Sequence, residues 1–279
     1  MPRRQLSFKR LGYAPGRSPT PLRGALTEGR SHFLTSGGEA ESTIAYCLGW
    51  FMTTMNISDE LETASPEVVL RWAVEEFAPD IALATGFGVE GCVLVSMLSA
   101  IRPGRGARIF YLDTDLLFPE TYALRDQLEA RYGVHFERRA TSLSVSDQAA
   151  EYGERLWERE PDLCCRLRKV EPLREMLKGM RAWVTAIRRD QSPARARISP
   201  VEWDEKFGLV KINPLARWSA RDVWNYIAKH DVPYNPLHDQ GYPSIGCVPC
   251  TTPVQIGEMP RAGRWRGTGK SECGIHEGR

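Results

Sequence analysis

The sequence lacks a long apolar run, a signal peptide and any large excess of charge. Its longest apolar run, Ile44–Met52, is too short to span a bilayer. Its 37 Lys and Arg residues nearly balance its 35 Asp and Glu residues, and it has no helix-turn-helix or aromatic-rich RNA-binding motif. We therefore expect no membrane and no nucleic acid among its partners. Seven cysteines without a signal peptide indicate a reducing, cytoplasmic environment.

The sequence also lacks internal repeats and the G-x-x-x-x-G-K-[ST] motif, so we do not expect a P-loop NTPase. What charge it has is unevenly distributed. Residues 161–200 contain ten Lys or Arg and only four Asp or Glu. This local excess of positive charge favours a small anionic ligand over a nucleic acid duplex.

A composition of 42% apolar and 26% charged residues is typical of a globular protein, and 279 residues suffice for one large α/β domain. Residues 1–57 begin with an aperiodic stretch rich in Arg, Pro, Gly and Ser. We expect a disordered extension there, or a start codon assigned too early with Met55 as the true start; a regulatory or targeting extension is the alternative. The folded domain should cover residues 58–253, and residues 254–279 should form a flexible tail.

Buried strand patterns alternate with helical patterns through the folded domain. The expected strands are 80–85, 108–112, 135–138, 182–187 and 209–212. The expected helices are 66–77, 89–99, 119–132, 146–159, 168–178 and 220–230. This alternation predicts an α/β fold with a Rossmann-like parallel sheet flanked by helices, in which ligands bind at the carboxyl ends of the strands.

Two cysteine pairs are the most informative feature of the sequence. Cys164 and Cys165 are adjacent, and neighbouring cysteines cannot form an ordinary disulfide without severe strain. Cys247 and Cys250 have the C-x-x-C spacing of metal and iron–sulfur sites. The two pairs together supply four thiolates, which suits one [4Fe–4S] cluster. A zinc ion and four unligated buried thiols are the alternatives.

Three further motifs lie at expected strand ends or in the tail. The loop Gly86–Gly91 fits G-x-G-x-x-G, which predicts a nucleotide phosphate at a helix N-terminus and leaves NAD or FAD open. Arg188 and Arg189 suit a phosphate or sulfate group, unless they are a solvated surface pair. Cys273 in the tail, near Lys270 and His276, is a candidate nucleophile or an incidental thiol.

These motifs together resemble the assimilatory sulfonucleotide reductases, specifically the iron–sulfur adenylyl-sulfate (APS) reductases, over about residues 58–279. The residues that carry the resemblance are Cys164-Cys165, Arg168–Leu173, Arg188–Ser192, Lys211–Leu215, Gly246–Thr251 and Glu272–His276. The resemblance implies an adenine nucleotide α-hydrolase-like fold and one [4Fe–4S] cluster on Cys164, Cys165, Cys247 and Cys250. It also implies that the loop after the first strand binds the sulfonucleotide and not NAD.

The resemblance further implies the reaction, which is reduction of APS to sulfite and AMP for cysteine biosynthesis. Cys273 would attack the sulfur of APS and carry a sulfonate, which thioredoxin or a glutaredoxin-like dithiol would release. The substrate-binding residues would be Thr85, Gly86, Phe87, Gly88, Glu90, Asp113, Lys169, Arg188, Arg189, Arg261, Arg264 and His276.

The sequence leaves three properties open: the choice of substrate, the oligomeric state and the class of protein. One is PAPS as a substrate, although family members specific for PAPS typically lack the four cluster cysteines. Another is homo-oligomerisation. The last is an unrelated class of protein, a cluster protein that senses iron or redox state and binds nucleic acid. One departure from the family pattern is notable: Asp115 and Leu116 stand where the family usually has Gly and Arg. This change puts nucleotide affinity in doubt.

Overall fold

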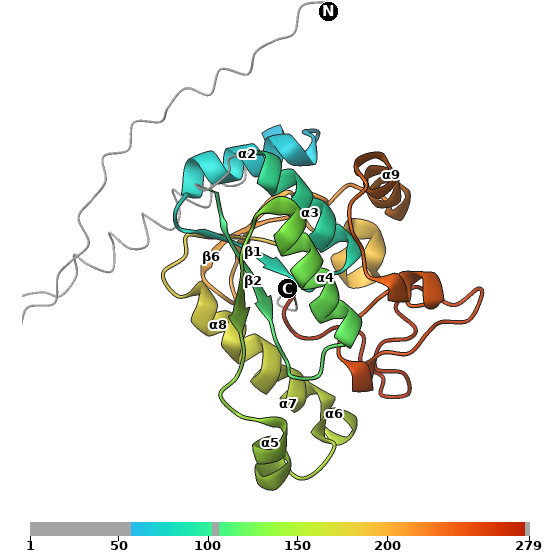
Figure 1. Cartoon of the computed structure of the whole chain (residues 1–279). Helices are drawn as coiled ribbons and strands as arrows, with labels where there is room; N and C mark the ends of the chain where they lie inside the picture. Colours follow the sequence, from blue (N-terminus) through green and yellow to red (C-terminus); the bar gives the residue numbers. More distant parts are fainter. Residues whose placement is uncertain (1–56, 102–105, 277–279) are drawn as a thin grey trace, which may run out of the picture. The chain divides into compact units, whose positions relative to one another are not determined.

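The protein is built on a six-stranded sheet with the order β3-β2-β1-β4-β6-β5 (Figure 1). This computed structural model describes residues 57–101 and 106–276, which belong to one compact unit, residues 44–279. The expectation for residues 1–57 therefore falls almost wholly outside the described residues. The strands are β1 Ile81–Thr85, β2 Arg108–Leu112, β3 Phe136–Arg139, β4 Ala182–Val184, β5 Val201–Asp204 and β6 Leu209–Ile212.

Five of the six strands run parallel, which confirms the expected α/β class. Strand β1 pairs with β2 and β4, β2 also pairs with β3, and β4 also pairs with β6. Strand β5 was not predicted; it pairs antiparallel with β6 through a hairpin that turns at Gly208 (φ +71°). Its four residues, Val-Glu-Trp-Asp, alternate apolar and polar, but of the two apolar side chains only Val201 is buried, whereas Trp203 is 40% exposed.

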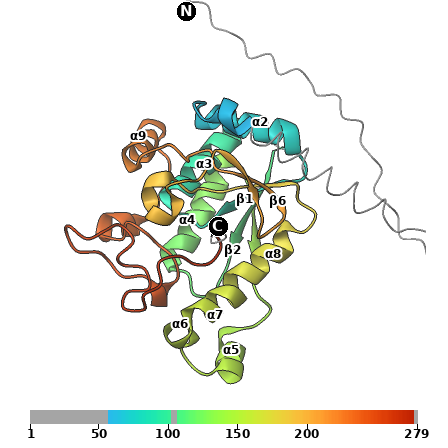
Figure 2. The same cartoon turned by 180° about the vertical axis from the view of Figure 1, so that it is seen from behind.

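Helices cover both faces of the sheet, as Figures 1 and 2 show for α3 and α4 on one side of the strands and α8 on the other. One core joins apolar side chains of the strands to α2, α3, α4 and α9. The second core lies beneath α8 and includes Ala82, Phe110 and Trp183 of the strands. The bounds are α2 Pro66–Phe77, α3 Val89–Ile101, α4 Pro119–Tyr132, α8 Glu171–Leu177 and α9 Ala220–His230.

The region before α8 differs from the two long helices that the sequence predicted. Gly153, which has a positive φ (+83°), follows α5, Val145–Tyr152, and separates it from α6, Leu156–Arg159. Next, α7 (Pro161–Cys165) continues through a π-helical turn, Arg166–Val170, directly into α8. The cysteine pair therefore lies inside a helical segment and not between two helices. Among the described residues, no helix is both long enough and apolar enough to cross a membrane.

The order of the strands creates a switch point between β1 and β4. The chain moves outward from β1 to β2 and β3, then returns to the other side of β1 with β4. Loops that leave the two strands at such a point diverge, and ligands of α/β proteins bind in the crevice between them. The loop after β1 contains Gly86–Gly88, and the segment after β4 contains Arg188 and Arg189. The two predicted nucleotide motifs thus flank one crevice.

Gly91 makes the first of these loops possible. A Cβ atom at Gly91 would lie 2.5 Å from Oγ1 of Thr85, so α3 packs against the end of β1 only because this residue has no side chain. Phe87 adopts a left-handed conformation (φ +58°) and donates its N–H to the same Thr85 oxygen at 3.0 Å. The third glycine of the motif therefore serves helix–strand packing.

We expect Gly91→Ala to destabilise the fold by about 1–3 kcal/mol, because the added methyl group overpacks a buried contact. The measurement is chemical denaturation. Gly86→Ala is the matched control for stability, because a Cβ atom there would meet nothing within 4 Å. Equal midpoints for the Gly91→Ala variant and the unmodified protein would show that this contact relaxes without cost.

Candidate active site at the carboxyl edge of the sheet

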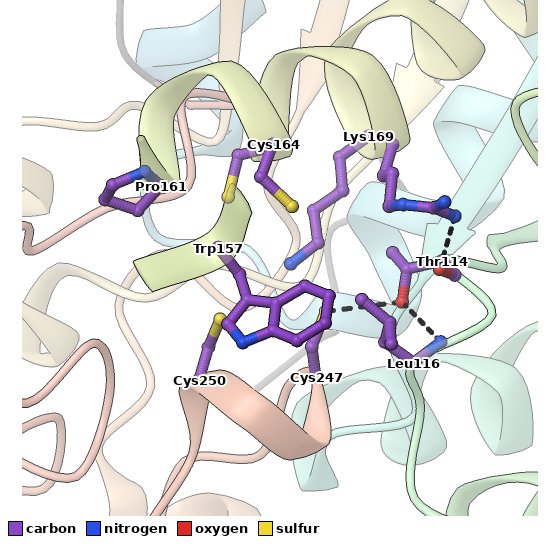
Figure 3. Close-up of a pocket in the computed structure, with 10 residues that line it drawn as sticks. Thr114, Leu116, Trp157, Pro161, Cys164, Lys169, Cys247 and Cys250 are labelled. Carbon is purple, nitrogen blue, oxygen red and sulfur yellow. Dashed lines mark hydrogen bonds between the residues drawn. The ribbon is translucent and has the colours of Figure 1, made fainter. Parts of the chain in front are cut away.

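The four paired cysteines line one cavity (Figure 3). Cys164 and Cys165 lie at the end of α7 and are buried. Cys250 ends the short 3₁₀ turn Val248–Cys250, and Cys247 directly precedes this turn. The N–H of Cys250 donates to the carbonyl of Cys247 at 3.0 Å. The remaining lining residues are Thr114, Leu116, Trp157, Pro161, Arg168 and Lys169. All cysteines among the described residues are free thiols.

Two cations that line this cavity lie in the π-helical turn. A π-helical turn contains more residues than an α-helical turn, and such turns recur at functional sites. Here the turn contains Arg168 and Lys169, directly after the cysteine pair. Figure 3 shows the Lys169 ammonium group between the cysteine helix and the turn that carries Cys247 and Cys250.

Burial and Lys169 set the protonation of the thiols. Burial raises the pKa of Cys164, of Cys165 to about 11 and of Cys250 to about 12. Cys247 is different: burial acts to raise its pKa, but Lys169 and the Thr114 hydroxyl stabilise the thiolate and bring the pKa below its ordinary value. In turn, burial acts to lower the pKa of Lys169, but Cys247 and Cys165 raise it. Lys169 is therefore the charged partner of the Cys247 thiolate.

The predicted residues around the switch point do come together. Oε1 of Glu90, at the start of α3, accepts from Nε of Arg188 at 3.0 Å and from Nε2 of Gln191 at 3.0 Å. Arg188 also pairs with Asp190. These contacts tie the loop after β1 to the segment after β4. The side chain of Phe87 lies in the core against Tyr111 and Phe136, so this residue offers a ligand only its backbone.

Arg189 and Asp113 have structural partners. Arg189 forms a bidentate ion pair with Glu62, at 2.7 and 3.0 Å. Asp113 is buried at the end of β2 and accepts from Nε of Arg138 at 2.6 Å and from the Tyr122 hydroxyl at 2.7 Å. Burial acts to raise the pKa of Asp113, but these hydrogen bonds lower it below its usual value. Any ligand of either residue competes with contacts already made.

The tail residues 270–276 lie against the body of the protein. The Glu272 carboxylate is buried and accepts from Arg195 at 2.7 Å, from Arg261 at 3.0 Å and from the Ser192 hydroxyl at 3.1 Å. Lys206 donates to the carbonyl of Gly274. Arg261 was predicted as a site residue, whereas Arg195 was not. An acidic residue directly before the candidate nucleophile was the available signal, because a buried carboxylate needs a cation.

Cys273 is partly exposed and lies near the four-cysteine cavity. It is close enough to affect the pKa values of Cys165 and Lys169. Burial lowers the pKa of Arg261, Glu272 opposes this effect, and the neighbouring cations Arg195 and Arg264 lower the pKa further. Cys273 thus lies where the four-cysteine cavity meets a cluster of three arginines.

The end of the described tail closes the sheet face beneath α8. Ile275 packs into the second core, and the His276 ring stacks on Trp183 of β4 with ring centroids 5.7 Å apart. Burial, and then the nearby Lys211 and Arg195, hold the pKa of His276 well below its ordinary value. His276 is therefore neutral in this position. Lys270 pairs with Asp162 of α7, which directs its ammonium group toward that carboxylate.

Fold and site together define a Rossmann-like α/β protein of the adenine nucleotide α-hydrolase-like class, with a four-thiol cavity at the carboxyl edge of its sheet. The family model of the phosphoadenosine phosphosulfate reductase domain matches residues 80–253, more than half of the chain. The chain therefore belongs to the sulfonucleotide reductase family, a family of oxidoreductases.

Individual relatives agree with this assignment. The chain is 51% identical to the adenosine 5'-phosphosulfate reductase of Salinibacter ruber, over 79% of this chain and 87% of that protein. It is 47% identical to adenosine 5'-phosphosulfate reductase 1 of Bacillus subtilis, over 75% and 89% of the two chains. It is also 47% identical to the phosphoadenosine 5'-phosphosulfate reductase of Gloeobacter violaceus, over 82% and 96%.

Solved structures agree on the fold. The crystal structure of phosphoadenylyl-sulfate (PAPS) reductase from Candida auris, in a phosphate complex, matches 71% of this chain and 96% of that chain. Its TM-score is 0.62 and its identity is 35%. Candida glabrata FMN adenylyltransferase, 16% identical over 75% of this chain and 71% of that chain, has a TM-score of 0.51 and shares the fold alone.

We expect Glu272→Gln to release the tail from its docked position, because the amide keeps the shape of the carboxylate but not its charge between two arginines. Cleavage of the tail in limited proteolysis should accelerate about tenfold or more, which corresponds to about 1.4 kcal/mol per tenfold. Glu258→Gln is the matched control, since Glu258 pairs with Arg266 in the same tail but at its surface. Equal cleavage rates for the two variants would contradict this role of Glu272.

Proposed function

We propose that this chain reduces APS to sulfite and AMP, with Cys273 as the nucleophile and thioredoxin or a glutaredoxin-like dithiol as the reductant. The observation that carries the proposal is the position of Cys273, a free thiol between the four-cysteine cavity and the arginine cluster Arg195, Arg261 and Arg264. The names of the relatives from Salinibacter ruber and Bacillus subtilis support APS as the substrate.

The arginine cluster supports an anionic substrate. The Nε atoms of Arg195 and Arg264 are buried without a hydrogen-bond partner among the described residues. A buried donor without an acceptor is costly, so an oxygen of a phosphate or sulfate group would stabilise both side chains. Lys169 adds a fourth cation on the side of the cysteines. Together these groups would neutralise the charge that develops as AMP leaves.

The proposed reaction has two stages, transfer of the sulfonate to Cys273 and its release as sulfite by the dithiol. The Cys273 thiolate attacks the sulfur of APS, an S–S bond forms, and the S–O bond to AMP breaks with its electron pair going to the AMP phosphate. A thiolate of the external dithiol then attacks Sγ of Cys273, and sulfite leaves with the electron pair of the S–S bond. The second thiol closes a disulfide within the partner and regenerates the Cys273 thiol. The dithiol supplies the two electrons that reduce the sulfur.

We also propose that Cys164, Cys165, Cys247 and Cys250 hold one [4Fe–4S] cluster. Four thiols around one cavity suit a group with several metal atoms, since each iron needs its own thiolate. The adjacent pair favours a cluster over a single zinc ion, because the side chains of neighbouring residues diverge and reach two irons of one cluster more easily than one ion. When bound, the cluster supplies four metal–sulfur bonds that join the two cysteine segments. Lys169, which lines the same cavity, would then be fixed between the two segments.

We expect Cys273→Ser to abolish sulfite release while APS still binds, because a serine hydroxyl is scarcely ionised near neutral pH. The assay measures sulfite from APS and from PAPS with reduced thioredoxin, and APS should be the better substrate. Without thioredoxin, mass spectrometry should find one sulfonate on the peptide that contains Cys273. Cys92, buried in α3 with its pKa raised to about 12, is the internal control. A sulfonate on another cysteine, or normal turnover by Cys273→Ser, would refute the mechanism.

We expect anaerobically purified protein to be brown and to contain iron and acid-labile sulfide. Cys250→Ser should lose the colour and the iron together, because it removes one of four ligands. The matched control is Cys92→Ala, which alters a buried cysteine outside the cavity. A colourless protein with stoichiometric zinc would overturn the cluster assignment, and it would leave the role of Cys273 to be judged by the sulfonate experiment.

A further inference from the structure

Asp115, the residue that departs from the family pattern, adopts an unusual backbone conformation. Its φ of +57° lies in the left-handed region, which glycine occupies without strain and which asparagine and aspartate tolerate. A glycine at this position would relieve the backbone. The presence of aspartate therefore calls for a contact made by its side chain.

The carboxylate of Asp115 lies between two arginines. Oδ2 is 3.2 Å from Nη1 of Arg168, and Oδ1 is 2.7 Å from Nη2 of Arg138 on β3. Arg168 is only 1% exposed, and its other partners are neutral oxygens of Gln148, Thr114 and Leu143. Among the described residues, Asp115 is thus the carboxylate that compensates a buried guanidinium group, and leaving such a charge uncompensated is strongly unfavourable.

The loop around Asp115 also holds the second cysteine pair. The carbonyl of Leu116 accepts from the N–H of Val248 at 2.7 Å, and the Thr114 hydroxyl lies 3.3 Å from Sγ of Cys247. Leu117 forms an isolated bridge with Cys247. Because Arg168 follows Cys165 by three residues in the same helical segment, the loop 113–117 joins the two cysteine pairs through protein contacts alone.

We propose that Asp115 is a positioning residue of the four-cysteine site. Its carboxylate fixes Arg168 and the loop 113–117 together, and this holds Cys247 opposite Cys164 and Cys165. The inference rests on the proposed function only in assigning a metal group to these thiols; the protein contacts exist without it. It also accounts for the departure from the family pattern, because the charge of Asp115 serves the cysteine site and not the nucleotide.

Hydrogen–deuterium exchange of the full chain tests this role without reference to any metal. Asp115→Asn keeps the shape and the tolerance for the left-handed conformation but removes the charge. We expect the Val248 amide to exchange about tenfold faster in this variant, because opening of the loop becomes easier. Asp231→Asn is the matched control: Asp231 is also left-handed (φ +51°) and pairs with Arg131 at 3.0 Å, but at an exposed site. Unchanged exchange at Val248 would overturn the proposal.

Two further variants separate charge from backbone. Asp115→Gly suits the backbone but lacks the carboxylate, so it should speed the exchange as Asp115→Asn does; protection as in the unmodified protein would overturn the proposal. The double variant Asp115→Asn with Arg168→Gln removes both charges and leaves neither buried charge uncompensated. The fold by which it accelerates exchange should therefore be smaller than the product of the accelerations in the two single variants.

Iron release to a chelator, measured on the anaerobically purified protein, is the second readout. It should be about tenfold faster for Asp115→Asn and unchanged for Asp231→Asn. Exchange that responds to Asp115→Asn in a protein that fails to reduce APS would uphold the proposal and refute the proposed function. Normal APS reduction by the unmodified protein, with exchange unaffected by Asp115→Asn, would uphold the proposed function and overturn the role of Asp115.

Discussion

The site depends on compensating two buried cations that follow the cysteine pair. Arg168 and Lys169 occupy one π-helical turn, yet they are stabilised in different ways. Arg168 has a carboxylate, Asp115, and three neutral oxygens, whereas Lys169 has cysteine sulfurs. One cation therefore ties the helix to the loop after β2, and the other remains available to the interior of the site. Neighbouring side chains of a helical turn point in different directions, so these two cations can serve two purposes.

A second electrostatic constraint governs the tail. Glu272 lies between Arg195 and Arg261, directly before the proposed nucleophile Cys273, and its charge has the same sign as that of the proposed substrate. An incoming phosphate or sulfate group therefore competes with Glu272 for Arg261. By contrast, Lys169 and Arg264 have no carboxylate partner among the described residues. These two cations can receive an anion while the tail stays docked, whereas full use of Arg261 requires the carboxylate to move.

The sequence allowed most of the fold to be predicted, and less of the site. Parallel strands buried on both faces are continuous apolar runs, so β1, β2 and β6 were found within one residue of their ends. The π-helical turn was not predictable, because its residues also fit an ordinary helix. The cysteine pairs carried clear motifs and Arg261 followed from the family resemblance, but Arg195 was not predicted and Asp115 was noted only as a departure from the family pattern. Their roles come from partners that are distant in the sequence, Glu272 and Arg168, and only the folded chain brings these pairs together.

Arg188 and Arg189 were expected to bind a phosphate or sulfate group, but in the folded chain both have carboxylate partners. Arg188 lies between Glu90 and Asp190, and Arg189 lies on Glu62, so both guanidinium groups already have carboxylates. Their first effect is to join α3, the segment after β4 and the residues before α2 around the switch point. A nucleotide that binds there meets a rigid rim whose net charge is small. Most of the attraction for its anionic groups must then come from the cations near Cys273, where the proposed reaction would break the bond to sulfur.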